Sequence, residues 1–298
     1  LHQFTSLYLA SLPNAYAAAK GVHVIWLTAR LESDAERRLN ETAQFLMDIS
    51  ALKSFDDGGA AVDRILHVRL LHAAIRWFIE NDPAVARPPD ADPAPLPTRP
   101  TWATAWGCPV NQEDLAGTLL TFTSVVIDAF RRSGVEFTTA GAEDYLYLWR
   151  VVGHFLGVDP TLVPQDLAAA ETLQCRIFHR QHASSAVGAA LTKTLLDLVS
   201  KRLPGPVSRL GPAMMRRYLG DDVADMIDVP KATAERWAVG ALVYLTRVLT
   251  LGRRFDPVPR WLSNWVGRKM LDGLLAADRH GQRVPFAIPD HLRVDDRT

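Results

Sequence analysis

Hydrophobic residues recur along most of the chain at the spacing of an α-helix. The clearest run has an apolar residue at every third or fourth position: Leu115, Leu119, Phe122, Val126 and Phe130. Such steps place side chains on one helical face. Asn111 precedes the run as a predicted N-cap, and Asp114 three residues later completes the pattern of a capping box. The pattern predicts a helix that begins at about residue 112.

The same periodicity covers nearly all of the remaining sequence. A run over about 142–156 ends at Gly157, with Pro160 just beyond, which is typical of a helix end. Further helices are predicted over about 36–49, 59–80, 166–179, 185–202, 212–219, 232–251 and 261–277. The only β-like patch is 22–25, inside a segment that is equally compatible with helix. We therefore predict an all-α fold.

One segment breaks this pattern. Residues 83–100 contain seven prolines, which remove backbone donors and break helices. The segment is either an interdomain linker or an extended excursion over the surface. We favour an excursion over 81–108 within a single globular domain of residues 1–298, because the helices on both sides read as parts of one core. Trp102, Trp106 and Cys108 are expected to anchor it.

Composition and charge narrow the choice of partners. The 33 basic residues balance the 33 acidic ones, so no basic excess favours binding to nucleic acid. We interpret the pairs Arg216-Arg217 and Arg253-Arg254 as solvated helix ends. The longest apolar stretch, 237–251, includes Thr246 and Arg247 and is too short for a membrane span. We therefore expect neither a nucleic-acid partner nor a transmembrane segment.

The termini and cysteines leave several questions open. Cys108 and Cys175 are the only cysteines, which excludes a disulfide scaffold but not a single bridge. The chain begins at Leu1 rather than Met, so we expect that a segment preceding it is missing. The sequence does not decide between the cytoplasm and export, nor does it define the oligomeric state.

Common catalytic motifs are absent. The sequence has no GxGxxG after a strand, no GxxxxGK[ST], no GxSxG and no HExxH. It also lacks CxxCH, which excludes a covalent c-type haem, and neither cysteine lies in the glycine-rich context of a thiolate ligand. A haem, if bound, would be held non-covalently by histidine.

The first candidate cluster surrounds His72. On a helix, Arg69, His72 and Arg76 share one face, and the two cations would lower the pKa of an imidazole between them. The arrangement makes sense if a neutral His72 binds a metal while the arginines meet carboxylates, because haem offers both iron and propionates. Ala73 and Ala74 would leave room for a flat macrocycle. The alternative is a partly exposed helix whose charges face water.

A second cluster is Arg38, Glu41 and Thr42, again on one helical face. A guanidinium and a hydroxyl could hydrogen-bond a bound dioxygen, and Glu41 could move a proton. The alternative is an ordinary Arg–Glu helix pair, with Thr42 bonding its own backbone.

Three more histidines are weaker candidates. His179 and His182 lie one turn apart and could hold a metal, although no third ligand is near in sequence; the alternative is an exposed polar helix end. His154 could contact a cofactor or its immediate surroundings, or make a hydrogen bond in the core.

The block RLLHAAIR at 69–76 resembles the R-x-x-H-x-x-(V/I)-R signature of the latex-clearing-protein and MpaB-type oxygenase family. Other blocks that resemble this family occur in the family's order: SLPNAYAAAKG at 11–21, RRLNET at 37–42, PVNQEDLAGTLLTFT at 109–123 and EDYLYLWRVVGHFLGV at 143–158. They span roughly the first half of the chain, and the second half resembles the family only loosely.

This resemblance implies an all-helical fold around non-covalent haem b. It implies that His72 is the proximal ligand, that Arg38 and Thr42 lie near the distal side, and that Arg76 lies near the propionates. Rubber-cleaving members insert dioxygen across a double bond of polyisoprene. The chain departs from them at Glu41, where some members have lysine. It also has no acidic residue in 15–30, the region expected to hold their general-base glutamate.

We therefore predict a haem b-dependent oxygenase that uses dioxygen on an apolar small-molecule or polymer substrate, such as an unsaturated isoprenoid. Arg38, Glu41 and Thr42 are the predicted catalytic residues. His72 is the predicted iron ligand, with Arg69, Arg76 and His154 as further cofactor contacts. The alternatives are another haem oxidoreductase, a haem- or apolar-ligand-binding helical protein without turnover, and a helical interaction protein without a cofactor.

Overall fold

The predicted start of the central helix is confirmed. In the computed structural model, the Asn111 side chain accepts hydrogen bonds from the backbone N–H groups of Glu113 and Asp114, and Asp114 accepts from the Asn111 N–H at 3.1 Å. The apolar run does not form one helix, however. It divides at Thr123, where φ is −109° and ψ is −91° and the hydroxyl donates to the Leu119 carbonyl at 3.1 Å. A hydroxyl that bonds the preceding turn competes with regular helix geometry.

The structure describes residues 6–28, 34–89, 96, 101–135, 138–202 and 209–252. Its elements are η1 (Leu7–Ser11, a π-helix), α2 (Leu12–Tyr16), α3 (Gly21–Thr28), α4 (Asp34–Ser50), α5 (Ala61–Asn81), η2 (Thr104–Trp106), α6 (Gln112–Phe122), α7 (Ser124–Arg132), α8 (Thr139–Leu156), η3 (Pro160–Leu162), α9 (Leu167–Gln181), α10 (Ala186–Arg202), α11 (Gly211–Leu219), α12 (Asp221–Met226) and α13 (Thr233–Gly252). Over these ranges the only β pairing is two isolated bridges. The all-α prediction is confirmed, and the β-like patch 22–25 is helical. The helix predicted at 261–277 lies outside the described residues.

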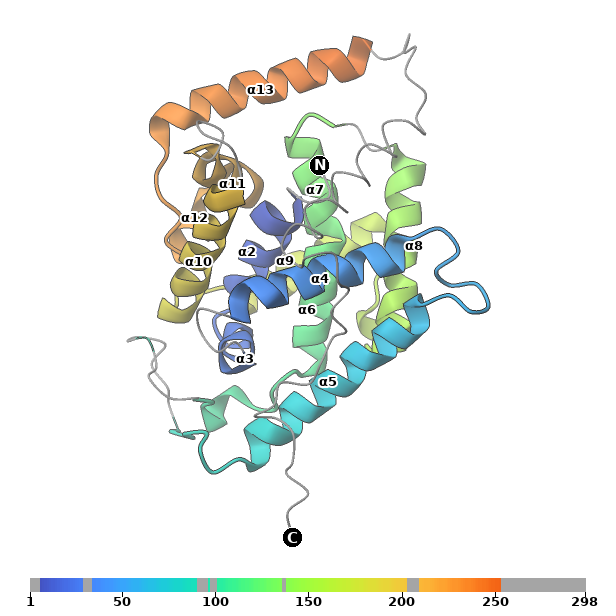
Figure 1. Cartoon of the computed structure of the whole chain (residues 1–298), viewed down its shortest axis with the longest axis vertical. Coiled ribbons are helices and arrows are strands. Elements are labelled where there is room, and N and C mark those ends of the chain that lie inside the picture. The colour runs from blue at the N-terminus through green and yellow to red at the C-terminus, as the bar shows by residue number, and fades with distance from the viewer. Residues whose placement is uncertain are drawn as a thin grey trace.

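The helices surround α6 and α7, which run through the middle of the molecule (Figure 1). One buried cluster joins η1, α2 and α3 to α7, α10 and α11. A second joins α4 and α5 to α6 and α8, and a third joins α6 to α8 and α9. The packing of α6 in two of these clusters makes it the centre of the fold. None of the helices in the described ranges is long and apolar enough to cross a membrane.

The end predicted for α8 is also confirmed. Gly157 has φ of +81°, which favours glycine because it has no Cβ. A Cβ at this position would lie 2.8 Å from Cζ of Arg69, a residue of α5. Gly157 therefore both ends α8 and lets α5 approach it.

The structure corrects the interpretation of Arg216 and answers whether the two cysteines form a disulfide bridge. Arg216 is not a solvated helix end, because its side chain is only 4% exposed and bonds to residues of α12 and the loop after it. Cys108 and Cys175 are both exposed and free, so no bridge joins them. The pair Arg253-Arg254 lies outside the described residues.

The part of the proline-rich segment that is described packs back onto the core. Ala86 bridges to Thr101, and the Trp102 N–H donates to the Ala86 carbonyl at 3.0 Å. The buried Trp102 side chain joins a cluster with Leu71 of α5 and Leu27 of α3. Trp102 is thus an anchor, as predicted, and Trp106 packs against the same cluster. Cys108 is exposed and does not anchor the segment in the core, so that part of the prediction was wrong.

Candidate functional site

Two helices that carry the predicted site residues diverge from one loop. α4 and α5 are joined by residues 51–60 and open away from that loop (Figure 1). Beside the loop, Ile49 of α4 shares a buried cluster with Ala61 and Ile65 of α5. Thr42 precedes Ile49 by seven residues, and His72 follows Ile65 by seven. Seven residues are about two turns, or about 10 Å along the helix, and return to within about 20° of the same face. Thr42 and His72 therefore lie on the faces of α4 and α5 that carry Ile49 and Ile65, each about two turns from the cluster that these two isoleucines share.

His72 is half-buried rather than on the solvent face of α5. Its neighbours Leu71 and Ile75 are buried, whereas Leu70 and Trp77 on the opposite face are more than half exposed. His72 thus has apolar side chains beside it, while Arg69 on the same face of α5 is exposed, as in the alternative of a partly exposed helix.

The two arginines of the His72 face contact neighbouring elements. Arg76 donates through Nε to the Pro109 carbonyl at 3.1 Å and through Nη2 to the Val110 carbonyl at 2.6 Å. Arg69 donates through Nη1 to the Phe155 carbonyl at 3.3 Å. These bonds tie α5 to the start of α6 and the end of α8. The contact of Arg69 and Arg76 with a cofactor stays a prediction.

The α4 residues of the site are partly described. Glu41 is buried and Thr42 is half-buried. Glutamate side chains are seldom buried to this extent unless they are paired. Arg38 lies in α4, but its side chain is outside the described residues.

The other histidine candidates lie elsewhere. His154 is exposed in the last turn of α8, with its ring 5.4 Å from the Phe155 ring. His179 is exposed, while His182 stacks on Phe178 at 4.2 Å, and burial lowers the pKa of His182 to about 4. Within the described ranges, no three His, Cys, Asp or Glu side chains group to hold a metal ion.

A residue that the sequence reasoning missed is His23 of α3. It is only 2% exposed, and its ring lies 4.7 Å from that of Trp106 at an angle of 58°. Neither ring nitrogen has a hydrogen-bond partner among the described residues. Burial lowers its pKa to about 4. No local pattern in the sequence indicated this residue, because its burial depends on the distant Trp106.

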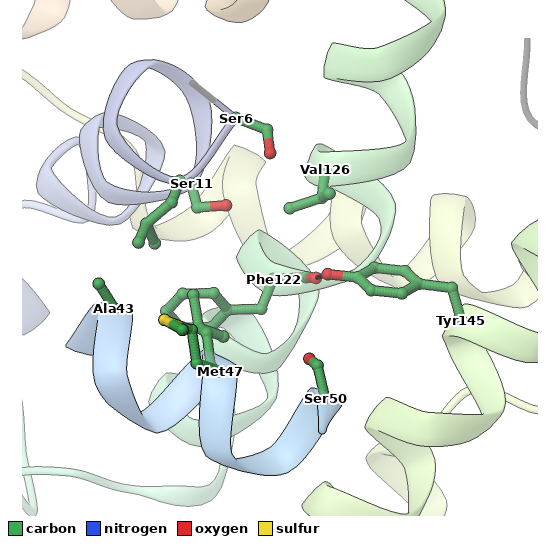
Figure 2. A pocket seen from close by; sticks show the side chains of 10 residues that line it. Ser6, Ser11, Ala43, Met47, Ser50, Phe122, Val126 and Tyr145 are labelled. Carbon is green, nitrogen blue, oxygen red and sulfur yellow. Dashed lines mark hydrogen bonds between the residues drawn. The ribbon is translucent and has the colours of Figure 1, made fainter. Parts of the chain in front are cut away.

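A small pocket lies on the other face of α4 (Figure 2). Its volume is about 60 Å³, and it is lined by Ser6, Leu7, Ser11, Ala43, Leu46, Met47, Ser50, Phe122, Val126 and Tyr145. The Ser11 hydroxyl donates to the Thr121 carbonyl at 2.7 Å, and the Tyr145 hydroxyl to the Phe122 carbonyl at 2.8 Å. The pocket is lined by none of the predicted site residues. Glu41 lies on the opposite face of α4 from Ala43 and Met47, whereas Thr42 is one turn from the pocket residue Leu46.

Comparison with known proteins shows which family the chain is similar to. Residues 2–277 match the family model described as "ER-bound oxygenase mpaB/B'/Rubber oxygenase, catalytic domain". The chain is 29% identical over 264 residues to the rubber oxygenase of Streptomyces sp. (strain K30), covering 87% of this chain. It resembles the solved structure of latex clearing protein LCP in the closed state with a TM-score of 0.70 and 25% identity, over 97% of this chain and 74% of that one.

The match to the whole relative is partial, since the chain spans 60% of the length of the rubber oxygenase. The family model nevertheless covers most of the chain, including α4 with Thr42 and α5 with His72. The chain therefore belongs to the MpaB and rubber oxygenase catalytic-domain family.

Proposed function

We propose that this protein is an oxygenase that binds haem b non-covalently through His72 and acts with dioxygen on an apolar, isoprenoid-like substrate. The observation that carries the proposal is the position of the half-buried His72 on α5 and of Thr42 on α4, each about two turns from the buried cluster that Ile49 and Ile65 share. The names of the similar proteins, rubber oxygenase and latex clearing protein, support the reaction class and an apolar polymer as substrate.

The residues present fit such a cofactor in their chemistry. His72 offers a half-buried imidazole, a common ligand of haem iron. The cluster beside it is apolar and includes Leu27, Leu71 and Ile75, and apolar surroundings retain a porphyrin and exclude water. The buried imidazole of His23, whose ring nitrogens have no hydrogen-bond partner among the described residues, lies beside the same cluster and also supports a group that binds there.

Each side chain then has a definite task. Haem, when bound, supplies the iron at which dioxygen is activated. In our proposal His72 holds that iron, and the Thr42 hydroxyl orients dioxygen by a hydrogen bond. The buried Glu41 carboxyl would transfer a proton where the reaction requires one, and Arg38 would help to orient dioxygen. Arg76 would contact a propionate while it keeps its bonds to the 109–110 backbone.

The first experiment tests the ligand. The protein reconstituted with hemin should show a Soret band and a b-type pyridine haemochrome spectrum, and His72→Ala should lose stable haem while its helical circular dichroism stays native. His154→Ala is the matched control, because that histidine is exposed at the end of α8. A chain that takes up no hemin would refute the cofactor. Loss of haem in His154→Ala but not in His72→Ala would refute the ligand.

The second experiment tests turnover on polyisoprene and short unsaturated isoprenoids, with carbonyl products measured under dioxygen. Thr42→Ala should keep normal haem content and lose about tenfold or more in rate, because a hydrogen bond to a charged group is worth about 1.5–3 kcal/mol. Glu41→Gln should slow product formation with little change in dioxygen binding. Ser50→Ala, at the last residue of α4 and about two turns from Thr42, is the control. Haem binding without any product would instead favour a binding protein.

A further inference from the structure

His23 is buried in a way that a folded chain rarely tolerates. It is 2% exposed, and neither Nδ1 nor Nε2 has a hydrogen-bond partner among the described residues. An imidazole always carries at least one donor or acceptor that water would satisfy, so leaving both nitrogens unpaired destabilises the fold. A well-packed leucine at this position would avoid that cost. The histidine is thus better explained by a partner that arrives later.

The position of His23 indicates where such a partner would lie. His23 and Leu27 are one turn apart and share one face of α3. Leu27 belongs to the same buried cluster as Leu71 and Ile75, which flank His72 in α5. Trp106, which covers the His23 ring, packs against that cluster too. The unpaired imidazole therefore borders the apolar cluster beside the His72 helix.

We propose that His23 is an additional ligand-contacting residue of this site, whose imidazole hydrogen-bonds to the edge of the molecule that His72 binds. The proposal rests on the proposed function. The apolar cluster beside His23 suits a ligand with a large apolar surface, and the imidazole suits a polar atom, such as a carboxylate oxygen, at the edge of that ligand. A porphyrin that carries carboxylates has this chemistry. Burial keeps the imidazole neutral, with a pKa of about 4, so it can donate through one nitrogen to a carboxylate oxygen.

Two porphyrins separate the role of His23 from that of His72. Hemin contains the iron that His72 would bind, whereas protoporphyrin IX has the same carboxylates and no iron. We would measure the dissociation constants of both for wild type, His23→Leu, His23→Gln and His72→Ala, together with the urea midpoint of each ligand-free chain. Thr192→Val is the matched control, because Thr192 is also buried with an unpaired hydroxyl but lies in α10.

We expect opposite changes in stability and binding. His23→Leu should raise the urea midpoint of the ligand-free chain, because it removes an unpaired polar group, and should weaken the binding of both porphyrins about tenfold. His23→Gln should retain most of the affinity. His72→Ala should weaken hemin binding far more than protoporphyrin binding. Thr192→Val should raise the urea midpoint without changing either dissociation constant.

Other results would overturn the role of His23, either alone or together with the proposed function. Unchanged porphyrin binding in both His23 variants would overturn the role of His23 and leave the haem proposal intact. A wild-type chain that binds neither porphyrin would overturn both proposals. If His23→Leu does not fold, the ¹⁵N spectrum of imidazoles in the unmutated chain decides: a His23 ring signal that does not move on addition of protoporphyrin IX overturns the inference.

Discussion

Arg216 and His23 are both almost completely buried, at 4% and 2% exposure, but their surroundings differ. The Arg216 guanidinium donates through Nε to the carbonyls of Val229 and Pro230 at 3.1 Å each. Its Nη1 donates to Asp221 at 3.0 Å, and its Nη2 donates to Asp225 and to Val229. His23, by contrast, contacts an indole ring and has no hydrogen bond to its ring nitrogens within the described chain.

The difference follows from what each side chain can do with its charge. A guanidinium stays protonated in proteins, so a buried arginine must be paired throughout. An imidazole escapes the cost of a buried charge by becoming neutral, and burial lowers the pKa of His23 to about 4. The α11–α12 region is thus complete without a ligand. The ring nitrogens of His23 have no such partners among the described residues. We therefore assign the region around His23, and not the α11–α12 region, to the ligand site.

The strongest test of this contrast is the replacement of Arg216. Arg216→Leu removes every bond of the guanidinium and leaves buried carbonyls unpaired, so the free energy of unfolding should fall by about 3–5 kcal/mol. Urea unfolding followed by circular dichroism measures the loss. The adjacent Arg217→Leu is the control, because Arg217 is exposed and bonds only the Arg132 carbonyl among its described partners; its effect should be below about 1 kcal/mol. Equal effects of the two variants would show that the Arg216 network is not structural.

The buried histidines should make the stability of the fold depend on pH. The pKa values of His23 and His182 fall from 6.5 to about 4 on folding. Between these values the unfolded chain binds more protons than the folded chain, so stability is full above about pH 6.5 and decreases as the pH falls to about 4. Each group contributes up to about 3 kcal/mol to that loss.

The variant His23→Leu isolates one of these contributions. Buried carboxyls such as Asp114 have raised pKa values and titrate in the opposite sense, so the wild-type curve alone mixes several groups. The difference between wild type and His23→Leu should grow steadily from pH 7 to pH 4. Urea unfolding at several pH values measures it. A constant difference would mean that His23 titrates normally in the folded chain.

Local signals predicted the framework of the fold well. The Asn111 capping box and the Gly157 helix end were both predictable because their partners lie within a few residues. The break at Thr123 was not, since it depends on a threonine hydroxyl bonding the previous turn rather than on a glycine or proline. The burial of Arg216 was missed because the basic pair was considered without the acids of the next helix.

The site was predictable only in part. The motif around His72 and the cluster around Thr42 were found from helical spacing and family resemblance, and the fold places both on facing helices. Their chemical roles remain predictions. His23 could not be found that way, because its burial depends on Trp106, 83 positions later in the chain. Tertiary packing, rather than any local pattern, decides which polar groups lose their water.

A smaller change in stability tests whether Arg69, like Arg216, contributes to the stability of the fold. Gly157→Ala places a Cβ 2.8 Å from Cζ of Arg69 at a positive φ, so it should destabilise the fold by more than the roughly 1 kcal/mol expected for the backbone alone. Gly58→Ala is the matched control, with φ of +79° and no atom within 4 Å. Thermal unfolding of both variants gives the difference. If the two losses are the same, Arg69 moves away without cost and its bond to Phe155 contributes little.

The smallest expected effect comes from cutting the proline-rich segment, which we propose to be an excursion from a single domain. One buried cluster contains Leu27 and Leu71 from before the segment and Trp102 and Val110 from after it. Because burying these residues together stabilises both sides, a chain nicked near Arg87 or Arg99 should stay associated and keep its circular dichroism. Limited proteolysis followed by size-exclusion chromatography under native conditions tests this, with separation in urea as the control that cleavage occurred. An independently folded fragment that begins near Thr101 would instead show two domains, and the His72 helix would then lie in a different domain from α6.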